Sequence, residues 1–554
     1  MRLNLLDTIG NWNSQLFREL KGRLKMGNIA IASALSLGGQ LLLFLSLRAQ
    51  LPVAPPAGEY TSPIASQFCT ELDHKSHAIN CLKDATGNLT INWSSWYLEM
   101  FVWLSIFSAI ALLVAGTYLL VSDLDKEERR GTLNFIRLSP QSATTIFIGK
   151  ILGVPILLYL AAILAVPLHI YSGLTAQIPL HHILCFDIAM LASCALFYSS
   201  AMLFGLTTSW LGGFQPWLAS AAVLVFMTTA FNAPSVGNAA DLLTFLSPAA
   251  VLKQVVYQVI DSRNSSVDWL VGDFARLEWF HLPVGEHLVS CTALSFLISA
   301  VATYWMWQGW QRRFPNPIAT VLSKRQSYLL VICYQSIILG FALQSNIISW
   351  VDNIAFLYIP NLMVFLALIA ALTPERQALY DWARYRRQLV PSSHKSWRRY
   401  PILDLIWSEK SPALVAIAIN LISSTLILTP WMLANTHAFP TMISFLNLIL
   451  IYATVTQLFL FAKIRNQAIW AACTVGGAIF LPPTILSMLS LTHEKALLIL
   501  RFSVFPIFSY WWASVDTILL PLLGQWTVLV LLNLQLRRQL RIAGESASKA
   551  LLKA

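Results

Sequence analysis

The densest run of charged side chains in this sequence lies between two long apolar stretches, from Asp123 to Pro140. Acids and bases alternate in blocks at its start, and Ser139-Pro140 closes it. Groups of both signs packed this closely can form ion pairs with another charged surface. The run predicts a short helix on the cytoplasmic surface of a membrane, and its chemistry is electrostatic docking of a partner.

Sequence motifs for bond-making chemistry are missing. The chain has no Gly-x-Ser-x-Gly, no His-Glu-x-x-His and no glycine-rich dinucleotide loop. Gly149-Lys150 is followed by Ile151, where a Walker A motif requires Ser or Thr. We therefore predict that the chain is not an enzyme, with no catalytic residue, no metal and no cofactor of its own.

The composition predicts the fold class. Of the 554 residues, 56% are hydrophobic and 11% are charged, which exceeds what the core of a soluble protein needs. Because a membrane helix needs about 20 apolar residues, we predict an all-α polytopic bundle of about twelve helices. The predicted spans are 28–47, 98–121, 146–171, 183–208, 214–231, 287–308, 328–345, 354–373, 413–431, 442–462, 468–490 and 514–536.

Charge distribution predicts the orientation of the bundle. With the N-terminus inside, most of the 37 Lys and Arg residues fall on the cytoplasmic side, as the positive-inside rule requires. Both termini are then cytoplasmic, and we expect a multi-pass protein of the cell inner (plasma) membrane. The net charge of +11 is explained by this topology and by contact with membrane lipid, so no nucleic-acid partner is predicted.

Ionisable residues inside the predicted spans are few, and they lie near span ends. Lys150, His169 and Asp187 are each placed where they should reach water or lipid headgroups. A secondary carrier would be expected to show a deeper charge. Gly149 and Gly153 form a small-xxx-small pair, which predicts a close helix contact directly after the charged run.

Two of the seven cysteines lie in the predicted outer loop, at positions Cys69 and Cys81. In an oxidising compartment they would form a disulfide that closes a short loop. His74 and His77 fall between them, so a zinc site is a competing interpretation, and two free thiols are a third. The other five cysteines lie in or beside apolar runs and are predicted to be core residues.

A family resemblance rests on four segments of this sequence. The run Lys126-Glu-Glu-Arg-Arg-Gly-Thr-Leu133, the motif Leu138-Ser-Pro140 and Phe147-Ile-Gly-Lys-Ile-Leu-Gly153 resemble ABC-2 type permeases, the membrane subunits of ATP-driven exporters. The segment Gln15 to Leu24 is similar to the elbow helix of that family. The resemblance implies a six-helix unit at 1–310. Two further helices with a basic linker at 311–400 depart from it, and a second elbow with four helices at 401–554 is a degenerate repeat of the first unit or, as the alternative, an unrelated extension.

The resemblance also implies a function and a partner. A separate ABC-type ATPase would bind ATP and Mg and drive export of an amphipathic or lipid-like substrate, with a second permease chain possible. Reversal of the charges at 127–130 is expected to weaken ATPase binding without unfolding the bundle. The alternatives are a membrane accessory subunit that transports nothing and a secondary carrier. The implied ATPase-coupling residues are Lys126, Glu127, Glu128, Arg129, Arg130, Gly131, Thr132, Leu133, Arg18, Glu19, Lys21, Glu409 and Lys410; no substrate-binding residue is implied.

Overall fold

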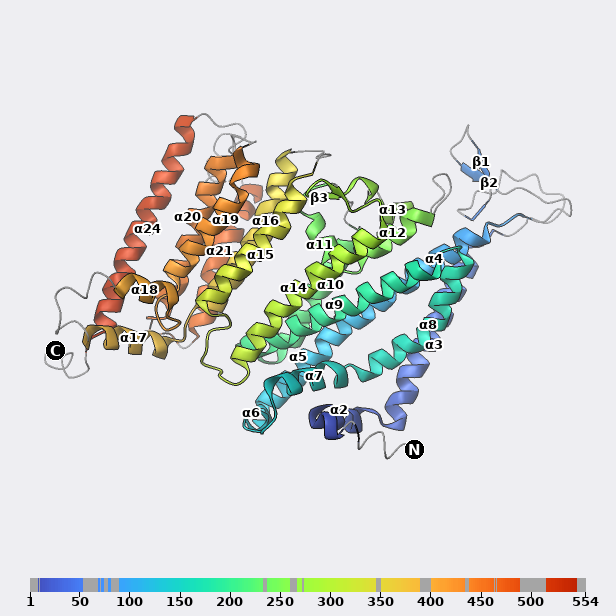
Figure 1. The fold of residues 1–554 in the computed structure, drawn as a ribbon, viewed down its shortest axis with the longest axis horizontal. Coiled ribbons are helices and arrows are strands. Elements are labelled where there is room, and N and C mark those ends of the chain that lie inside the picture. Colours follow the sequence, from blue (N-terminus) through green and yellow to red (C-terminus); the bar gives the residue numbers. More distant parts are fainter. Residues whose placement is uncertain are drawn as a thin grey trace. The chain divides into compact units, whose positions relative to one another are not determined.

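The structure is a computed structural model of the chain, and almost all of its ordered elements are helices (Figure 1). Clustering of contacts divides it into two compact units, which we describe separately: 1–237 with 241–315, and 238–240 with 316–554. The predicted segments 311–400 and 401–554 thus fall mainly within the second unit. The structure describes residues 8, 10–52, 68–69, 71–73, 78–80, 89–232, 237–259, 267–271, 274–344, 350–388, 400–433, 438–462, 464, 466–488 and 515–545.

The first unit begins with an amphipathic helix, and it contains the longest helical segment among the described residues. The small strands β1 and β2 pair antiparallel, with Leu72 opposite Ile79. From Trp93 to Arg129 the chain is one continuous helical segment of 37 residues. The elements are α2 (Ser14–Arg23), α3 (Met26–Ala49), β1 (Glu71–Asp73), β2 (Ala78–Asn80), α4 (Trp93–Ile110), the π-helix η1 (Ala111–Ala115), α5 (Gly116–Arg129) and α6 (Thr132–Arg137).

The rest of the first unit surrounds a central helix, α9, which contacts α5 and α14. Strands β3 and β4 form a second antiparallel pair. The elements are α7 (Ala143–Gly153), α8 (Ile156–Thr175), α9 (Leu180–Thr207), the 3-10 helices η2 (Ser209–Phe214) and η3 (Phe274–Arg276), α10 (Gln215–Asn232), α11 (Asp241–Phe245), α12 (Ala249–Val259), α13 (Asp268–Val271), β3 (Glu278–Trp279), β4 (Leu282–Pro283) and α14 (Leu288–Arg313).

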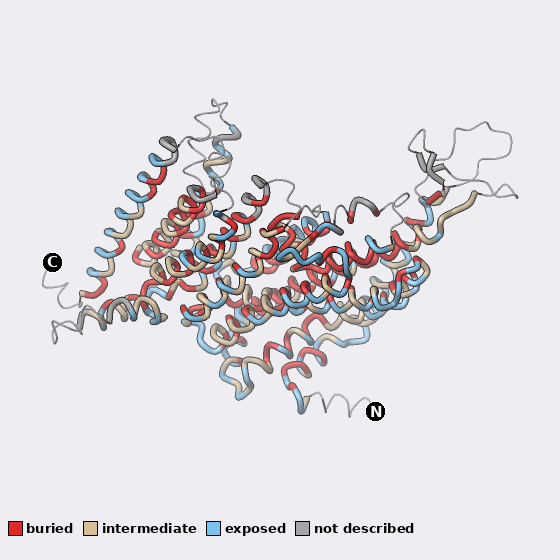
Figure 2. Tube along the Cα trace, turned by 45° about the horizontal axis from the view of Figure 1, so that its top comes forward, coloured by how far each residue is buried: buried red, intermediate tan, exposed pale blue. Residues whose placement is uncertain are grey.

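The second unit is also helical. Its long helices α15 and α19 pack together, and α20 packs on α24. In both units, buried residues line the facing sides of the helices, and the outward sides are exposed or half-buried (Figure 2). The elements are α15 (Lys324–Ala342), α16 (Trp350–Leu372), α17 (Arg376–Gln388), α18 (Tyr400–Trp407), α19 (Leu414–Leu433), α20 (Ala438–Phe459), α21 (Gln467–Met488) and α24 (Val515–Ala543).

The helical architecture agrees with a polytopic membrane protein. The described residues contain ten helices long and apolar enough to cross a bilayer, or eleven if the bent pair at α16 and α17 is one span. Each of the twelve predicted spans overlaps a helix, but α15 is not among those ten. It begins with Lys324-Arg325-Gln326-Ser327 and also contains Gln335, and these polar residues reduce its mean hydropathy.

The predicted span 146–171 is two helices, because the chain breaks at Val154–Pro155 between α7 and α8. Proline has no N–H to donate and its ring clashes with the preceding turn, so it begins a new helix more easily than it continues one. The first of these helices, α7, is only 11 residues long. It is therefore too short to cross a bilayer.

The π-helix η1 is the place where the central helix α9 makes a close contact through Tyr198. The Tyr198 hydroxyl donates a hydrogen bond of 2.9 Å to the Leu112 carbonyl. A Cβ at Gly116 would lie only 2.4 Å from the Tyr198 ring, so glycine is what allows this buried tyrosine to approach. The Leu112 carbonyl also accepts from the Gly116 N–H at the end of η1, so the tyrosine hydroxyl is its second donor.

Candidate functional site

Six charged side chains of both signs meet where α2, the end of α5 and α7 come together in the first unit. At the centre is Lys150, whose side chain is 0% exposed. Its Nζ lies 2.6 Å from Asp123 Oδ2 and 2.7 Å from Glu127 Oε2. We call this group the charged cluster: Arg18, Glu19, Arg23, Asp123, Glu127 and Lys150.

Two arginines of α2 complete the pairing of the α5 carboxylates. Arg23 donates to Asp123 at 2.6 Å, and Arg18 donates to Glu127 at 2.5 Å. Glu19 accepts from Arg18 at 3.1 Å and from Arg23 at 3.2 Å. Each α5 carboxylate is thus held between the lysine of α7 and an arginine of α2, so the charges join three helices.

The local sequence explains why these groups converge. Asp123 and Glu127 are four residues apart, so they lie on one face of α5. Three carboxylates face three basic groups, which leaves the cluster without net charge. Buried charges are tolerated when they are paired and hydrogen-bonded, and this balance permits Lys150 to be wholly enclosed. Our expectation that Lys150 reaches water is wrong, because its partners lie within the protein.

The close helix contact predicted at Gly149 and Gly153 is confirmed, and the helix that approaches is α2. A Cβ at Gly149 would lie 2.9 Å from the backbone nitrogen of Leu16, and one at Gly153 would lie 2.5 Å from the Glu19 Cβ. Asn13 fixes the start of α2, since its Oδ1 accepts from the Leu16 N–H at 2.9 Å and its Nδ2 donates to the Thr145 carbonyl at 2.8 Å. Helix α2 is therefore docked on α7.

The structure divides the predicted coupling residues into two groups. Arg18, Glu19 and Glu127 belong to the charged cluster, and the Glu127 side chain is only 13% exposed. Arg129 pairs with Asp125 on its own helix. Reversing Glu127 would leave Lys150 beside a like charge, so that substitution also disturbs packing. Leu133 is buried, whereas the other members of the run are exposed: Lys126, Glu128, Arg129, Arg130, Gly131 and Thr132. On α2, Lys21 is exposed, and its Nζ lies 5.9 Å from the centroid of the Phe17 ring.

The predicted short surface helix is α6, and the charges that precede it belong to α5. Gly131 separates the two helices with a left-handed backbone (φ 72°), which favours glycine at a helix end. Beyond it, Phe135 is 78% exposed and Leu138 is 86% exposed. Sequence reasoning missed these two as site residues. The sequence feature that could have indicated them is a pair of apolar residues three positions apart in a segment too short to cross a membrane.

In the second unit a buried lysine also holds a short amphipathic helix. Lys324 Nζ donates to the Leu405 carbonyl at 2.6 Å, to Ser411 Oγ at 2.5 Å and to the Pro412 carbonyl at 3.2 Å. Burial lowers the pKa of Lys324 to about 8, while the negative charges of Asp404 and Glu409 oppose the shift.

The two predicted coupling residues of the second unit lie in the turn that follows α18. Glu409 is half-buried and acts electrostatically on Lys324, whereas Lys410 is exposed. The structure therefore places Glu409 beside the buried amine and leaves Lys410 at the surface of the unit.

The charged cluster is already filled by protein cations. Carboxylate oxygens of Glu19, Asp123 and Glu127 lie within 4.8 Å of one another, a spacing that could hold a metal ion. The ammonium and guanidinium groups occupy that space instead, so we assign no metal there. In the segment between α3 and α4, Cys69 is disulfide-bonded. Cys81 lies outside the described residues, and the pairing of the two stays a prediction.

A second polar group lies among α4, α8 and α9. Ser105 Oγ lies 2.9 Å from His169 Nε2 and donates its hydrogen to the Phe101 carbonyl at 2.7 Å. His169 Nδ1 lies 3.9 Å from Asp187 Oδ1, and the histidine side chain is 7% exposed against 38% for the aspartate. The expectation that His169 reaches water is wrong, whereas Asp187 is accessible.

The charged cluster links three helices of the first unit. It joins α2, the end of α5 and α7, and α7 is in turn fixed to α14, because Trp310 Nε1 donates to the Ala143 carbonyl at 3.0 Å. No family model, no curated protein and no solved structure matches this chain.

Proposed function

We propose that this chain is the permease subunit of an ABC-2 type exporter, located in the cell inner (plasma) membrane with both termini in the cytoplasm. The supporting observation is the charged cluster, which fixes an elbow-like helix to the end of α5 and to α7. A separate ATPase subunit binds ATP and Mg and supplies the energy. The substrate is amphipathic or lipid-like, and a second permease chain completes the pathway.

The length of the α4–α5 segment supports a cytoplasmic position for the cluster. Its 37 residues extend about 55 Å at 1.5 Å per residue, whereas the hydrocarbon core is about 30 Å thick. One end of the segment must therefore project from the bilayer. The charged end, from Asp123 to Arg129, is the one that cannot stay in hydrocarbon, and the positive-inside rule assigns it to the cytoplasm.

The surface proposed to contact the ATPase is the α6 surface, which we define as Phe135 on α6, Leu138 directly after it and Glu128 near the end of α5. Two large exposed apolar side chains beside a charge are typical of the centre of a protein interface. Arg137 lies over the Phe314 ring at 5.8 Å, which ties α6 to the end of α14. A push on Phe135 or Leu138 is thereby passed to two helices of the first unit.

Affinity purification of the tagged chain from its native membranes tests the proposal. We expect an ABC-type ATPase to co-purify, and the double variant Phe135→Ala/Leu138→Ala to lose most of it. The matched control is Leu433→Ala/Phe480→Ala, which removes the same two side-chain types from exposed positions (76% and 66%) of the second unit. The control should retain the ATPase at the wild-type ratio.

Two outcomes would contradict the proposal. If no ATP-hydrolysing subunit accompanies the intact chain, the chain is not a permease of this class. If the Phe135→Ala/Leu138→Ala variant retains the ATPase and also transports an amphipathic dye normally, α6 is not the docking element. Co-purification of the ATPase without any ATP-dependent transport would favour a membrane accessory subunit.

A proton-coupled carrier is the second candidate, and the polar group around His169 is the observation that favours it. The Ser105 hydroxyl gives its single hydrogen to the Phe101 carbonyl, so His169 Nε2 must donate to Ser105 Oγ. In the neutral ring Nδ1 is then free to accept a proton on the side of Asp187. Buried histidines facing an accessible carboxylate are used in proton relays.

A transport assay on the purified chain, reconstituted into vesicles without any ATPase, distinguishes the two candidate functions. A carrier would move an amphipathic dye down an imposed pH gradient, and His169→Asn would abolish that movement. His181→Asn, at an exposed position on α9, is the matched control. An exporter permease would show no gradient-driven movement with or without either substitution.

A further inference from the structure

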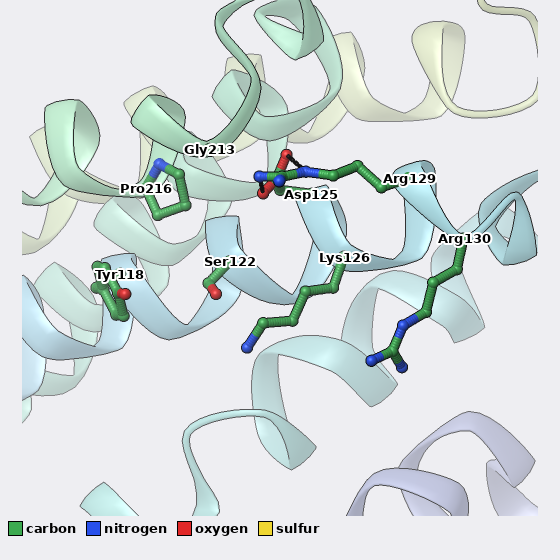
Figure 3. Close-up of a pocket in the computed structure, with 8 residues that line it drawn as sticks. All are labelled: Tyr118, Ser122, Asp125, Lys126, Arg129, Arg130, Gly213 and Pro216. Carbon is green, nitrogen blue, oxygen red and sulfur yellow. Dashed lines mark hydrogen bonds and ion pairs between the residues drawn. The ribbon is translucent and has the colours of Figure 1, made fainter.

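A pocket of about 400 Å³ lies between the end of α5 and the turn that leads into α10, within the first unit (Figure 3). It is open to the surface, and half of its six polar side chains are basic. Three of its lining side chains are cationic and one is acidic. The lining residues are Tyr118, Ser122, Asp125, Lys126, Arg129, Arg130, Gly213 and Pro216.

Four of these residues recur at every fourth position, three of them on α5 and the last, Arg130, at its C-terminal cap. Tyr118, Ser122, Lys126 and Arg130 are each four residues apart, so their side chains lie one above another along the helix. Each step rises about 6 Å. Figure 3 shows Lys126 and Arg130 on the same side as Ser122, whereas Arg129 turns to the opposite side, toward Gly213. The face thus changes from aromatic to hydroxyl to cation.

The two cations on this face are available to a ligand. Lys126 and Arg130 are exposed, and among the described residues neither makes an ion pair. Arg129 differs, because it binds Asp125 through two nitrogens and passes over Gly213, where a Cβ would lie 2.9 Å from its Nη2. The Arg129–Asp125 pair therefore forms a wall of the pocket, and two positive charges stay uncompensated.

Exposed aromatic side chains place this pocket at the level of lipid headgroups. Tyr118 meets Trp217 edge to face at 5.0 Å between ring centroids. Trp217 is 63% exposed and Phe214 is 61% exposed. Trp and Tyr concentrate at membrane–water interfaces, where one end of the ring is apolar and the other is hydrated. Along α5 the aromatic rings come first and the cations follow toward the C-terminal end. The acyl chains and the phosphate of a phospholipid are arranged in the same order.

We propose that this pocket binds the headgroup phosphate of an anionic phospholipid. Lys126 and Arg130 hold the phosphate oxygens, since ammonium and guanidinium groups form strong charge-assisted hydrogen bonds with them. The Ser122 hydroxyl faces the glycerol and ester region, and the acyl chains lie against Trp217. Two uncompensated positive charges favour a headgroup with net negative charge over a zwitterionic one. This inference does not depend on the proposed function.

Native mass spectrometry of the detergent-purified chain tests the site with phosphatidylglycerol and phosphatidylcholine as probes. We expect one tightly bound phosphatidylglycerol and weaker phosphatidylcholine. The double variant Lys126→Gln/Arg130→Gln should bind phosphatidylglycerol about 30-fold more weakly, because each basic group near an anionic lipid surface contributes roughly fivefold. The matched control is Lys21→Gln/Lys25→Gln, which removes two exposed charges outside the pocket and should bind like the wild type.

Equal binding of the two lipids, or unchanged phosphatidylglycerol binding by the pocket variant, would overturn the proposal. An equal loss of phosphatidylglycerol binding in the pocket variant and in its control would also overturn the proposal. It would show that the lipid is attracted to basic charge in general and not to this pocket. Soluble glycerol phosphate distinguishes the source of the phosphate. If it displaces the lipid at micromolar concentration, the pocket is a site for a free phosphate ester; displacement only in the millimolar range or not at all supports the lipid.

Discussion

Replacing Lys150 by Met is the most direct test of the charged cluster. The substitution removes a wholly buried ammonium that lies 2.6 Å from one carboxylate and 2.7 Å from another. Loss of one partner from a buried ion pair costs about 3 to 5 kcal/mol. Asp123 and Glu127 each keep an arginine and are 17% and 13% exposed, so we expect the lower end, about 3 kcal/mol of unfolding free energy.

Lys126→Met is the matched control, because the same side chain is removed from an exposed position on α5. It should change the unfolding free energy by no more than about 0.5 kcal/mol. Adding Glu127→Gln to Lys150→Met restores equal numbers of positive and negative groups in the cluster. The double variant should therefore be more stable than Lys150→Met alone, with a coupling energy of about 1 to 3 kcal/mol.

Detergent-denaturation titrations of the purified chain measure these differences, with helical content as the signal. The reasoning is refuted if Lys150→Met is no less stable than Lys126→Met. It is also refuted if adding Glu127→Gln destabilises the Lys150→Met chain further. That result would show that the Glu127 carboxylate is not an excess negative charge once the lysine is gone. Either result would mean that the lysine is solvated rather than enclosed by α2, α5 and α7.

Three further predictions concern packing and titration. Gly153→Ala should cost about 1 to 3 kcal/mol by forcing α2 away from α7, whereas Gly39→Ala, inside α3 with nothing within 4 Å of its added Cβ, should leave the unfolding midpoint unchanged or raise it. Tyr198→Phe should cost about 1 kcal/mol, since the Leu112 carbonyl loses the bond from the tyrosine hydroxyl and keeps only the one from the Gly116 N–H; an unchanged midpoint would show that the π-turn does not need this second donor. Because burial lowers the pKa of Lys324 to about 8 from 10.5, the unfolded chain binds more protons than the folded chain between those values. Stability of the wild type relative to Lys324→Met should therefore rise with pH across this window, and a flat difference between the two titrations would contradict the assignment.

The apolar runs predicted most helices because membrane helices depend on a property of each segment by itself. A stretch such as Asn28 to Leu47 needs no partner to be recognised, and it appears in the structure as α3. The exceptions depend on single residues. Pro155 divides one predicted span into α7 and α8, and the polar start of α15 at Lys324 makes its membrane-spanning character weaker than its length indicates.

The candidate site was less predictable, because it depends on contacts between segments far apart in the chain. Arg23 and Asp123 are 100 residues apart, and Arg18 and Glu127 are 109 residues apart. Nothing in the local pattern states that α2 packs on α7, although Gly149 and Gly153 indicate that some helix comes close. The exposure of Phe135 could be predicted only after α6 was known to be short.

The charged end of α5 has separate roles because successive residues of a helix point about 100° apart. One face holds Asp123 and Glu127 against Lys150, another holds the pocket side chains, and Leu124 packs against Gly205 of α9. Neighbouring residues of the same type are therefore not equivalent, and Glu127 stabilises the fold while Glu128 is exposed. Reversing all four charges at 127–130 would break a buried pair and alter the surface together. Variants confined to one face are needed to distinguish loss of a partner from loss of the fold.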